Sequence, residues 1–231
     1  MANILSIDTS TEVGSVAFSK DGEVLFNRES FEDRSHAVKT GIFVDEVLDE
    51  AEKAGLNPDA VAVCSGPGSY TGLRIGVSLA KGLCYGYGIP LIAVDTHTVL
   101  TQGLLTEWNI KGDPLLCPMI DARRMEVYYA VFDKALNRIK PTVAEVIDAE
   151  SLLEYKDREV YVFGNGAEKC INVLSLPQLK FKDSIHPMAK YLAVLAEKAF
   201  KEKQFEDVAY FEPFYLKNFV ATVSTKNVLG K

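Results

Sequence analysis

Two aspartates that each end an apolar run are the residues best placed to handle a phosphate. Asp8 follows the run 4–7 and precedes Thr9-Ser10-Thr11, and Asp121 follows the run 115–120. If both carboxylates face one cleft, they can hold Mg²⁺ through water while the Thr9 hydroxyl donates to a phosphate oxygen. The alternative is structural, since an aspartate at a strand end also caps the next turn. For Asp8 both interpretations stay open.

The loop after the second aspartate is less suited to a phosphate. Ala122-Arg123-Arg124 stands where a phosphate loop usually has glycine to let the backbone come close. Capping is therefore the favoured role of Asp121. Further along, Gly164-Asn165-Gly166 follows a predicted strand. These glycines either pack against an adenine or make an ordinary strand-to-helix turn.

A longer glycine-rich stretch, Ser-Gly-Pro-Gly-Ser-Tyr-Thr-Gly-Leu-Arg-Ile-Gly, covers residues 65–76. It lies between an apolar run at 60–64, read as a strand, and an apolar-periodic run at 73–87, read as a helix. At such a junction backbone N–H groups and the helix dipole can face an anion or a partner chain. Leu73-Arg74 after Gly72 rules out a P-loop, and Thr71 stands where the dinucleotide fingerprint needs glycine. A tight turn with small residues for packing is the other interpretation.

Other catalytic groups find little support. His36, His97 and His186 each lack a second histidine or cysteine three or four residues away, the spacing that a helix-borne metal pair needs. His36 and His97 are predicted to be caps or surface contacts. Ser69 lacks the second glycine of a nucleophile elbow. The cysteines, widely spaced, are predicted to be buried free thiols in a reducing compartment: Cys64, Cys84, Cys117 and Cys170.

Strands and helices must position these residues, and their pattern occurs twice. In the first half strands are predicted at 4–7, 14–18, 24–27, 60–64 and 91–94, with helices at 35–54, 73–87 and 96–105. In the second half strands are predicted at 115–120, 126–132, 140–146 and 160–163, with helices at 167–174 and 186–205.

Laying Asp121 on Asp8 brings Tyr129-Ala130 onto Val16-Ala17 without a gap. The sequence therefore predicts an α/β protein of two duplicated βββαβα lobes, residues 1–108 and 109–231, the second with a C-terminal tail whose last dozen residues are loose. This is the plan of the two-lobed actin-like ATPase (ASKHA) fold. Fold alone does not give function.

Composition narrows the class of partner. The chain has 231 residues, a net charge of −7 and a pI near 5.1. Surfaces that grip nucleic acid directly are normally basic, so any contact with nucleic acid is expected to be indirect. No apolar run reaches the ~18 residues of a membrane span, and we expect a cytoplasmic protein without a targeting segment.

The helix at 73–87 is apolar on nearly every side and is rich in glycine. Its Gly72-x3-Gly76 and Gly82-x3-Gly86 pairs predict smooth faces for close helix packing. Glycine costs about 1 kcal/mol in a helix interior, so this number of glycines indicates close contact, either with the chain's own sheet or with a second chain. Bulky replacements of Gly76 or Gly82 are expected to weaken pairing and leave the monomer folded.

Three segments together resemble one family. Ile7-Asp8-Thr9-Ser10, the stretch 65–76, and Asp121-Ala122-Arg123 with Glu126-Val127-Tyr128 are similar to the bacterial TsaB family, formerly YeaZ. The resemblance covers essentially the whole chain and is weakest after about residue 140. It implies an actin-like fold without enzymatic activity of its own. The family serves as accessory subunit for N6-threonylcarbamoyladenosine at position 37 of tRNAs that read codons beginning with A.

The resemblance also implies partners: the catalytic paralogue TsaD, the small ATPase TsaE, tRNA only indirectly, and a homodimer when the chain is alone. The family pairs through the first two helices of the N-terminal lobe. The implied interface residues are His36, Gly68, Tyr70, Thr71, Gly72, Arg74, Gly76, Leu79 and Leu83.

TsaD carries a metal-binding His-x3-His after its fifth strand. The matching segment here, Asp95 to Thr101, lacks the pair because Thr101 stands opposite His97 and Leu100 opposite Thr96. No cofactor is expected on the isolated chain, and ATP and Mg²⁺ would act in the partner complex. Asp8, Thr9, Asp121, Gly164 and Gly166 are then a candidate vestigial nucleotide site.

Two hypotheses from different classes remain. The first is a scaffold whose docking favours the active arrangement of TsaD by population shift. The second is an active actin-like small-molecule kinase or ATPase that uses Asp8, Asp121 and the Gly164-Asn165-Gly166 turn. Calorimetry with Mg-ATP separates them. A metalloprotease would need a metal that scattered histidines do not supply.

Overall fold

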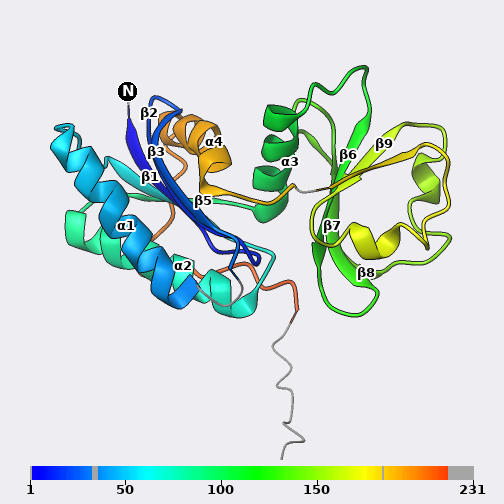
Figure 1. The fold of residues 1–231 in the computed structure, drawn as a ribbon, viewed down its shortest axis with the longest axis horizontal. Helices are drawn as coiled ribbons and strands as arrows, with labels where there is room; N and C mark the ends of the chain where they lie inside the picture. Colours follow the sequence, from blue (N-terminus) through cyan, green and yellow to red (C-terminus); the bar gives the residue numbers. More distant parts are fainter. Residues whose placement is uncertain (1, 33–35, 184, 218–231) are drawn as a thin grey trace, which may run out of the picture.

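The computed structural model describes residues 2–32, 36–183 and 185–217, and the side chains of 36 and 37 fall outside that description. Two five-stranded mixed sheets form two lobes, with α3 between them (Figure 1). The strand orders are β3-β2-β1-β4-β5 and β10-β9-β6-β7-β8. Each sheet has a central strand that is paired antiparallel on one side and parallel on the other, so the predicted duplication and the actin-like fold class are confirmed.

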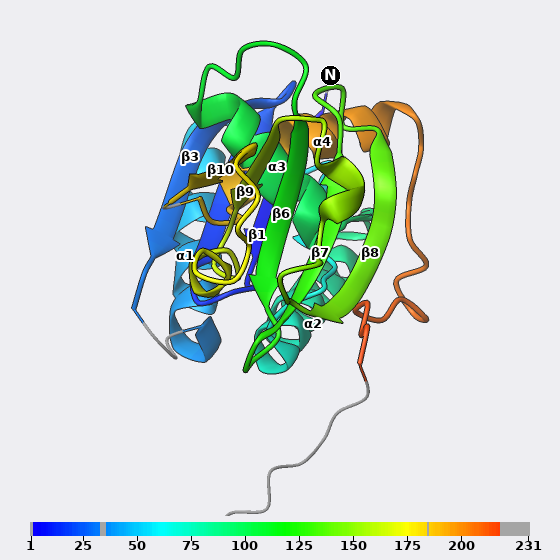
Figure 2. The same cartoon turned by 90° about the vertical axis from the view of Figure 1, so that its right-hand side faces the viewer.

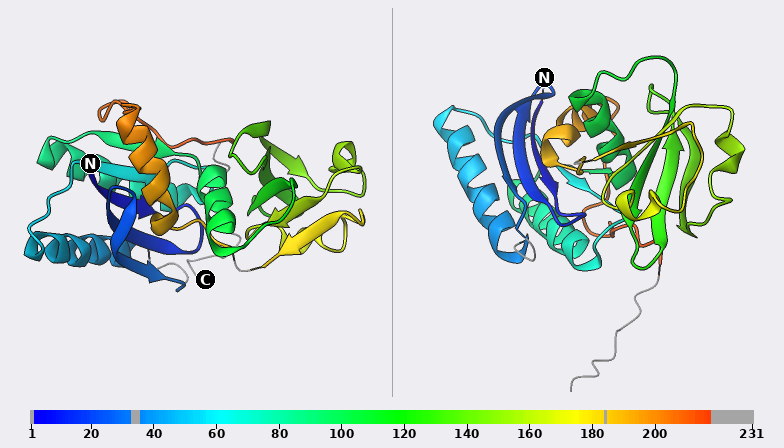
Figure 3. Two further views of the ribbon diagram at one scale, coloured as in Figure 1. Left: turned by 90° about the horizontal axis from the view of Figure 1, so that it is seen from above. Right: turned by 45° about the vertical axis from the view of Figure 1, so that its right-hand side comes forward.

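The N-terminal lobe follows the predicted order. Its elements are β1 (Asn3–Asp8), β2 (Gly14–Lys20), β3 (Glu23–Ser30), α1 (His36–Lys53), β4 (Ala60–Cys64), α2 (Tyr70–Tyr87), β5 (Leu91–Val94) and α3 (Thr96–Glu107). Helices α1 and α2 lie side by side on one face of the sheet (Figures 1 and 3). Apolar side chains of β1, β2 and β4 fill the space beneath them, and other apolar side chains of β1 and β4 are buried on the opposite face, so these two strands are near-continuous apolar runs.

The C-terminal lobe has five strands, like the N-terminal lobe, but only two short 3₁₀ turns lie between them. Its elements are β6 (Leu115–Asp121), β7 (Glu126–Phe132), β8 (Arg138–Val146), η1 (Leu153–Tyr155), β9 (Val160–Phe163), η2 (Glu168–Cys170) and β10 (Leu179–Lys182). The helix predicted at 167–174 is wrong in kind, because only a 3₁₀ turn forms at its start. Figure 2 shows this sheet with β9 and β10 on one side of β6 and with β7 and β8 on the other.

The strict gap-free superposition of the two halves is wrong by one residue. Asp8 pairs with Ser15 across β1 and β2, whereas Asp121 pairs with Val127 across β6 and β7. The second loop is therefore one residue shorter than the first. Because side chains alternate along a strand, a slip of one residue exchanges the two faces.

The predicted boundary at residue 108 separates the two sheets, but a later helix of the chain packs on the first lobe. Helix α4 (Ala189–Lys201) returns to the N-terminal lobe and covers the face of β1 and β2 opposite α1 and α2 (Figures 1 and 3). The Ala189 N–H donates to the buried Ser15 hydroxyl at 2.8 Å. Residues 202–217 continue over the same lobe, and α4 ends before the predicted Phe205. The looseness expected of the last dozen residues lies outside the described part of the chain.

Candidate functional site

The loop after β1 and the glycine-rich turn pack directly against each other. Ser69 N–H donates to Ser10 O at 2.7 Å, and the Thr9 hydroxyl donates to Gly72 O at 2.7 Å. Thr9 and Ser10 are buried, with 2% and 0% of their surface exposed. The backbone and hydroxyl groups predicted to meet a phosphate therefore bond within the chain.

Asp8 takes the capping role. It is fully buried, and its Oδ1 accepts from the Ser10 N–H at 2.9 Å and the Ser10 hydroxyl at 2.8 Å. This is an Asx-type turn. Asp8 and Thr9 were predicted as part of a nucleotide site, and in this arrangement neither side chain is accessible to a ligand.

The glycines of the turn make this contact sterically feasible. A Cβ on Gly68 would lie closer than 3.0 Å to Ser10 O, and a Cβ on Gly72 or Gly76 would lie closer than 3.0 Å to Thr9 oxygens. Gly72 and Gly76 are buried and face the chain's own first loop. Their contact with a partner therefore stays a prediction. A bulky residue at position 76 would meet Thr9 in the chain itself, so it is expected to lower stability as well as pairing. Gly82 meets nothing within 4 Å and is open.

The start of α2 lies earlier than predicted. Ser69 is the N-cap, and its hydroxyl oxygen accepts from the Gly72 N–H at 3.2 Å. This places Tyr70, Thr71 and Arg74 in the first turns of the helix. Thr71 and Arg74 are exposed, whereas Tyr70 is half-buried.

Among the other residues predicted at the pairing face, Leu79 and Leu83 are half-buried along α2. His36 begins α1, but its side chain lies outside the described part of the chain. Nothing in the isolated chain tests whether these residues contact a partner.

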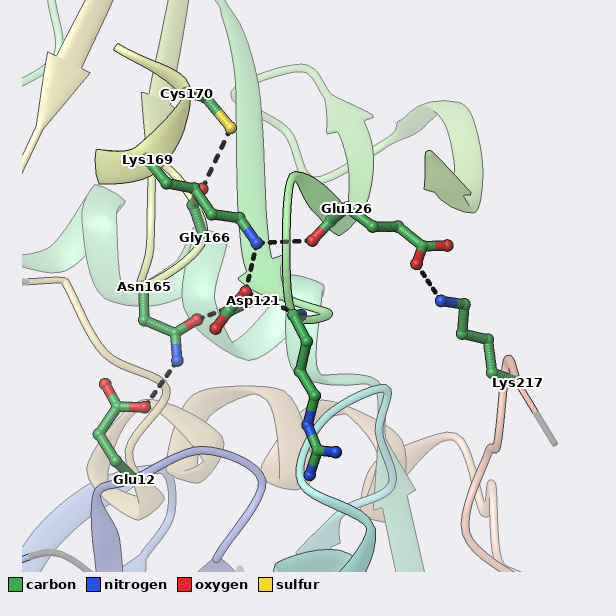
Figure 4. Close-up of polar contacts among 9 residues, drawn as sticks. Glu12, Asp121, Glu126, Asn165, Gly166, Lys169, Cys170 and Lys217 are labelled. Atoms are coloured by element: carbon green, nitrogen blue, oxygen red, sulfur yellow. Dashed lines mark hydrogen bonds and ion pairs between the residues drawn. The ribbon is translucent and has the colours of Figure 1, made fainter. Parts of the chain in front are cut away.

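Asp121 lies at the lobe junction and already has partners (Figure 4). It forms an ion pair with Lys169, and its Oδ1 accepts from the Arg123 N–H at 2.9 Å. Arg123 has a φ of 73°, a left-handed backbone conformation that few non-glycine residues adopt. The capping interpretation of Asp121 agrees with these contacts. An open depression of about 580 Å³ lies beside this pair, lined by Asp121, Asn165, Glu168, Lys169, Ile171 and Asn172.

The second glycine pair serves packing against the end of β6. A Cβ on Gly164 would lie closer than 3.0 Å to Met119 O, and a Cβ on Gly166 would lie 2.8 Å from the Ile120 carbonyl carbon. Gly164 also has a φ of +98°. The structural alternative for this turn thus has a direct steric cause.

Asn165 links the two lobes through Glu12, a residue that the sequence analysis missed (Figure 4). The Asn165 amide donates to Glu12 Oε2 at 2.6 Å, and Glu12 Oε1 lies 3.3 Å from His186 Nδ1. Burial alone would raise the pKa of Glu12. The interaction with His186 and the hydrogen bonds from the backbone and from Asn165 together outweigh burial, so the pKa is lowered. No spacing in the sequence marks Glu12, because its partners lie in distant loops.

His97 is a second link between the lobes, and its prediction as a cap or surface contact is wrong. The side chain is fully buried, and Asp95 is the N-cap of α3. His97 Nε2 lies 3.0 Å from Tyr128 O, and His97 Nδ1 lies 3.3 Å from the Thr142 hydroxyl. A carbonyl only accepts, so Nε2 carries the hydrogen and Nδ1 accepts from Thr142. Arg138 completes the link by an ion pair with Asp95 at 2.7 Å.

The four cysteines are buried free thiols, as predicted. Burial raises the pKa of the Cys64 and Cys117 thiols. In the part of the chain that the structure describes, no three acidic, histidine or cysteine side chains gather as metal ligands would. Among the same residues, no helix combines the length and apolarity needed to cross a bilayer.

The fold and this junction define a class: a two-lobed actin-like protein whose first phosphate-type loop is packed against its own glycine-rich turn. The family model described as "TsaD: tRNA N6-adenosine threonylcarbamoyltransferase" matches residues 30–225. The tRNA threonylcarbamoyladenosine biosynthesis protein TsaB of Escherichia coli K12 is 33% identical, over 94% of this chain and 96% of that protein. Its Bacillus subtilis 168 counterpart is 30% identical, over 93% of each.

A solved structure agrees with these relatives. YeaZ from Pseudomonas aeruginosa superimposes with a TM-score of 0.78 at 27% identity, over 94% of this chain and all of that one. The chain belongs to the TsaB (YeaZ) family of tRNA threonylcarbamoyladenosine biosynthesis proteins, and the predicted family is confirmed.

Proposed function

We propose that this chain is the non-catalytic accessory subunit that pairs with TsaD for formation of N6-threonylcarbamoyladenosine at position 37 of tRNAs reading codons that begin with A. The observation that carries the non-catalytic role is the packing of the glycine-rich turn on Thr9 and Ser10. In an actin-like kinase the corresponding loop must accept a phosphate. Here it is buried and its groups are already hydrogen-bonded.

The outer face of α1 and α2 supports pairing through these helices. Val38 and Ile42 on α1 are 69% and 50% exposed, and Tyr85 on α2 is 87% exposed. Large apolar side chains exposed on adjacent helices are typical of a protein interface. The opposite face of the sheet is covered by α4, which leaves α1–α2 as the uncovered helical layer (Figure 1). The same face would form the homodimer of the isolated chain.

The assembly would include TsaE and would contact tRNA mainly through the partners, since this chain has a net charge of −7. ATP and Mg²⁺ would be bound in the partner complex, in the cytoplasm. Docking activates TsaD only if this chain binds the active arrangement more tightly than the inactive one.

The test is nucleoside mass spectrometry of bulk tRNA after depletion of this protein, with reconstitution by the wild-type chain or by Ile42→Asp. We expect threonylcarbamoyladenosine to disappear on depletion and to return with the wild type but not with the variant. Unchanged modification through several generations would overturn the proposal. Micromolar binding of Mg-ATP by the isolated chain in calorimetry would support the alternative of an active ATPase.

A further inference from the structure

We propose that residues 208–217, here called the strap, hold the glycine-rich turn and the start of α2 in place. Tyr70 and Arg74 then position the α1–α2 face through the strap rather than by contact with the partner. The strap's contribution to pairing rests on the proposed function, whereas its hold on the turn does not.

The strap is anchored along the N-terminal lobe before it reaches the turn. Glu206 N–H, two residues before the strap begins, donates to Leu91 O at 2.9 Å. Val208 and Phe211 pack against the apolar core beneath α1 and α2. The ammonium of Lys81 on α2 donates to Ala209 O at 3.2 Å and Phe211 O at 2.9 Å. These contacts make the segment an integral layer of the lobe.

At the turn itself the strap meets the backbone. Phe214 N–H donates to Ser65 O at 2.8 Å. Gly66 has a φ of +109°, and a Cβ there would lie 2.7 Å from Phe214 O. Glycine at position 66 is therefore required both by its conformation and by the strap above it.

Tyr215 then joins the two side chains predicted to face the partner. Its ring lies 4.9 Å from the Tyr70 ring, and its hydroxyl oxygen accepts from Arg74 Nε at 3.2 Å. The Arg74 guanidinium also lies 4.2 Å above the Tyr70 ring. Tyr70 and Arg74 thus share an intramolecular partner far along the chain. Tyr215 lies 141 residues after Arg74.

The end of the strap reaches the other lobe. Lys217 forms an ion pair with Glu126 at the start of β7 (Figure 4). One segment therefore contacts α2, the glycine-rich turn and the C-terminal lobe, so a change at the lobe junction can be transmitted to the start of α2.

A double-mutant cycle separates this role from direct contact with the partner. Binding to TsaD is measured by calorimetry for the wild type, Arg74→Ala, Tyr215→Ala and the double variant. An aromatic or charge-assisted contact of this kind is worth up to about tenfold in affinity. We expect each single variant to bind about tenfold more weakly and the double variant to bind no more weakly than either. Effects that multiply, or a Tyr215→Ala variant with wild-type affinity, would overturn the proposal.

Tyr210 supplies the matched control, because it is a tyrosine of the same segment with 84% of its surface exposed. Tyr210→Ala is expected to bind like the wild type. Hydrogen exchange of the isolated chain tests the strap without a partner. Tyr215→Ala should speed exchange of the amides at 69–76 about tenfold, and Tyr210→Ala should not.

The two measurements test the proposed function and the role of the strap independently. If the wild-type chain does not bind TsaD, the proposed function fails while hydrogen exchange still tests the strap. If hydrogen exchange at 69–76 is the same in Tyr215→Ala and the wild type, the proposal that the strap holds the turn is refuted, whatever the binding data show.

Discussion

Lowering the pH from 7 to 5 is expected to destabilise the fold through His97. Burial lowers the pKa of this imidazole to about 4 from its ordinary 6.5; the carboxylate of Asp95 opposes the shift and the guanidinium of Arg138 adds to it. The unfolded chain therefore takes up a proton between pH 6.5 and 4 that the folded chain does not. Stability is fully present above pH 6.5 and is lost as the pH falls toward 4.

The difference between the pKa of His97 in the unfolded and folded chain corresponds to about 3 kcal/mol of folding free energy in total. About 2 kcal/mol of this falls between pH 7 and pH 5. The main cause is the burial of the imidazole, and the neutral ring already has partners, since Tyr128 O accepts from Nε2 and the Thr142 hydroxyl lies beside Nδ1. The carboxylate of Glu12 has a lowered pKa, so its contribution is lost only below its unfolded value of 4.5, outside this range.

Urea denaturation at pH 7, 6 and 5 measures the effect. His97→Gln stays neutral and keeps an amide donor. Between pH 7 and pH 5 its free energy of unfolding should fall by about 2 kcal/mol less than that of the wild type. Thr142→Val is the control, because it removes the hydroxyl but leaves the imidazole. It should lower stability at every pH and keep the wild-type dependence. If His97→Gln retains the full pH dependence, the assignment to His97 is refuted.

Three further predictions concern the glycines, the pairing face and the thiols. Gly76→Ala should lower the free energy of unfolding by about 2 kcal/mol through its clash with Thr9, whereas Gly82→Ala, in open space, should raise it by up to about 1 kcal/mol; equal effects in urea denaturation would contradict the burial of Gly76. Val38→Asp on the exposed face of α1 should weaken binding to TsaD at least about tenfold with an unchanged unfolding curve, and wild-type affinity in calorimetry would remove this face from the interface. All four cysteines should react with a thiol reagent only after unfolding, so rapid reaction of the native chain would show that one of them is accessible.

The N-terminal lobe was predictable because its signals are local. The strand and helix periods that predicted its elements depend on residues that are neighbours in the chain. The same local signals failed at η2, where the residues after Ala167 have helical periodicity but form only one 3₁₀ turn. The glycine spacing also predicted close contact along α2, which the chain itself provides at Gly72 and Gly76 but not at Gly82 and Gly86, where an added Cβ would meet nothing within 4 Å.

The sequence by itself therefore determined the class of fold, the family and the segment in which close contact occurs. It could not say what approaches this segment, and only the tertiary structure showed that Gly72 and Gly76 face Thr9 of the same chain. The return of α4, the burial of His97 and the contact of Arg74 with Tyr215 were decided in the same way. Each depends on residues far apart in the chain, and local propensity carries no information about which distant surface a segment will cover.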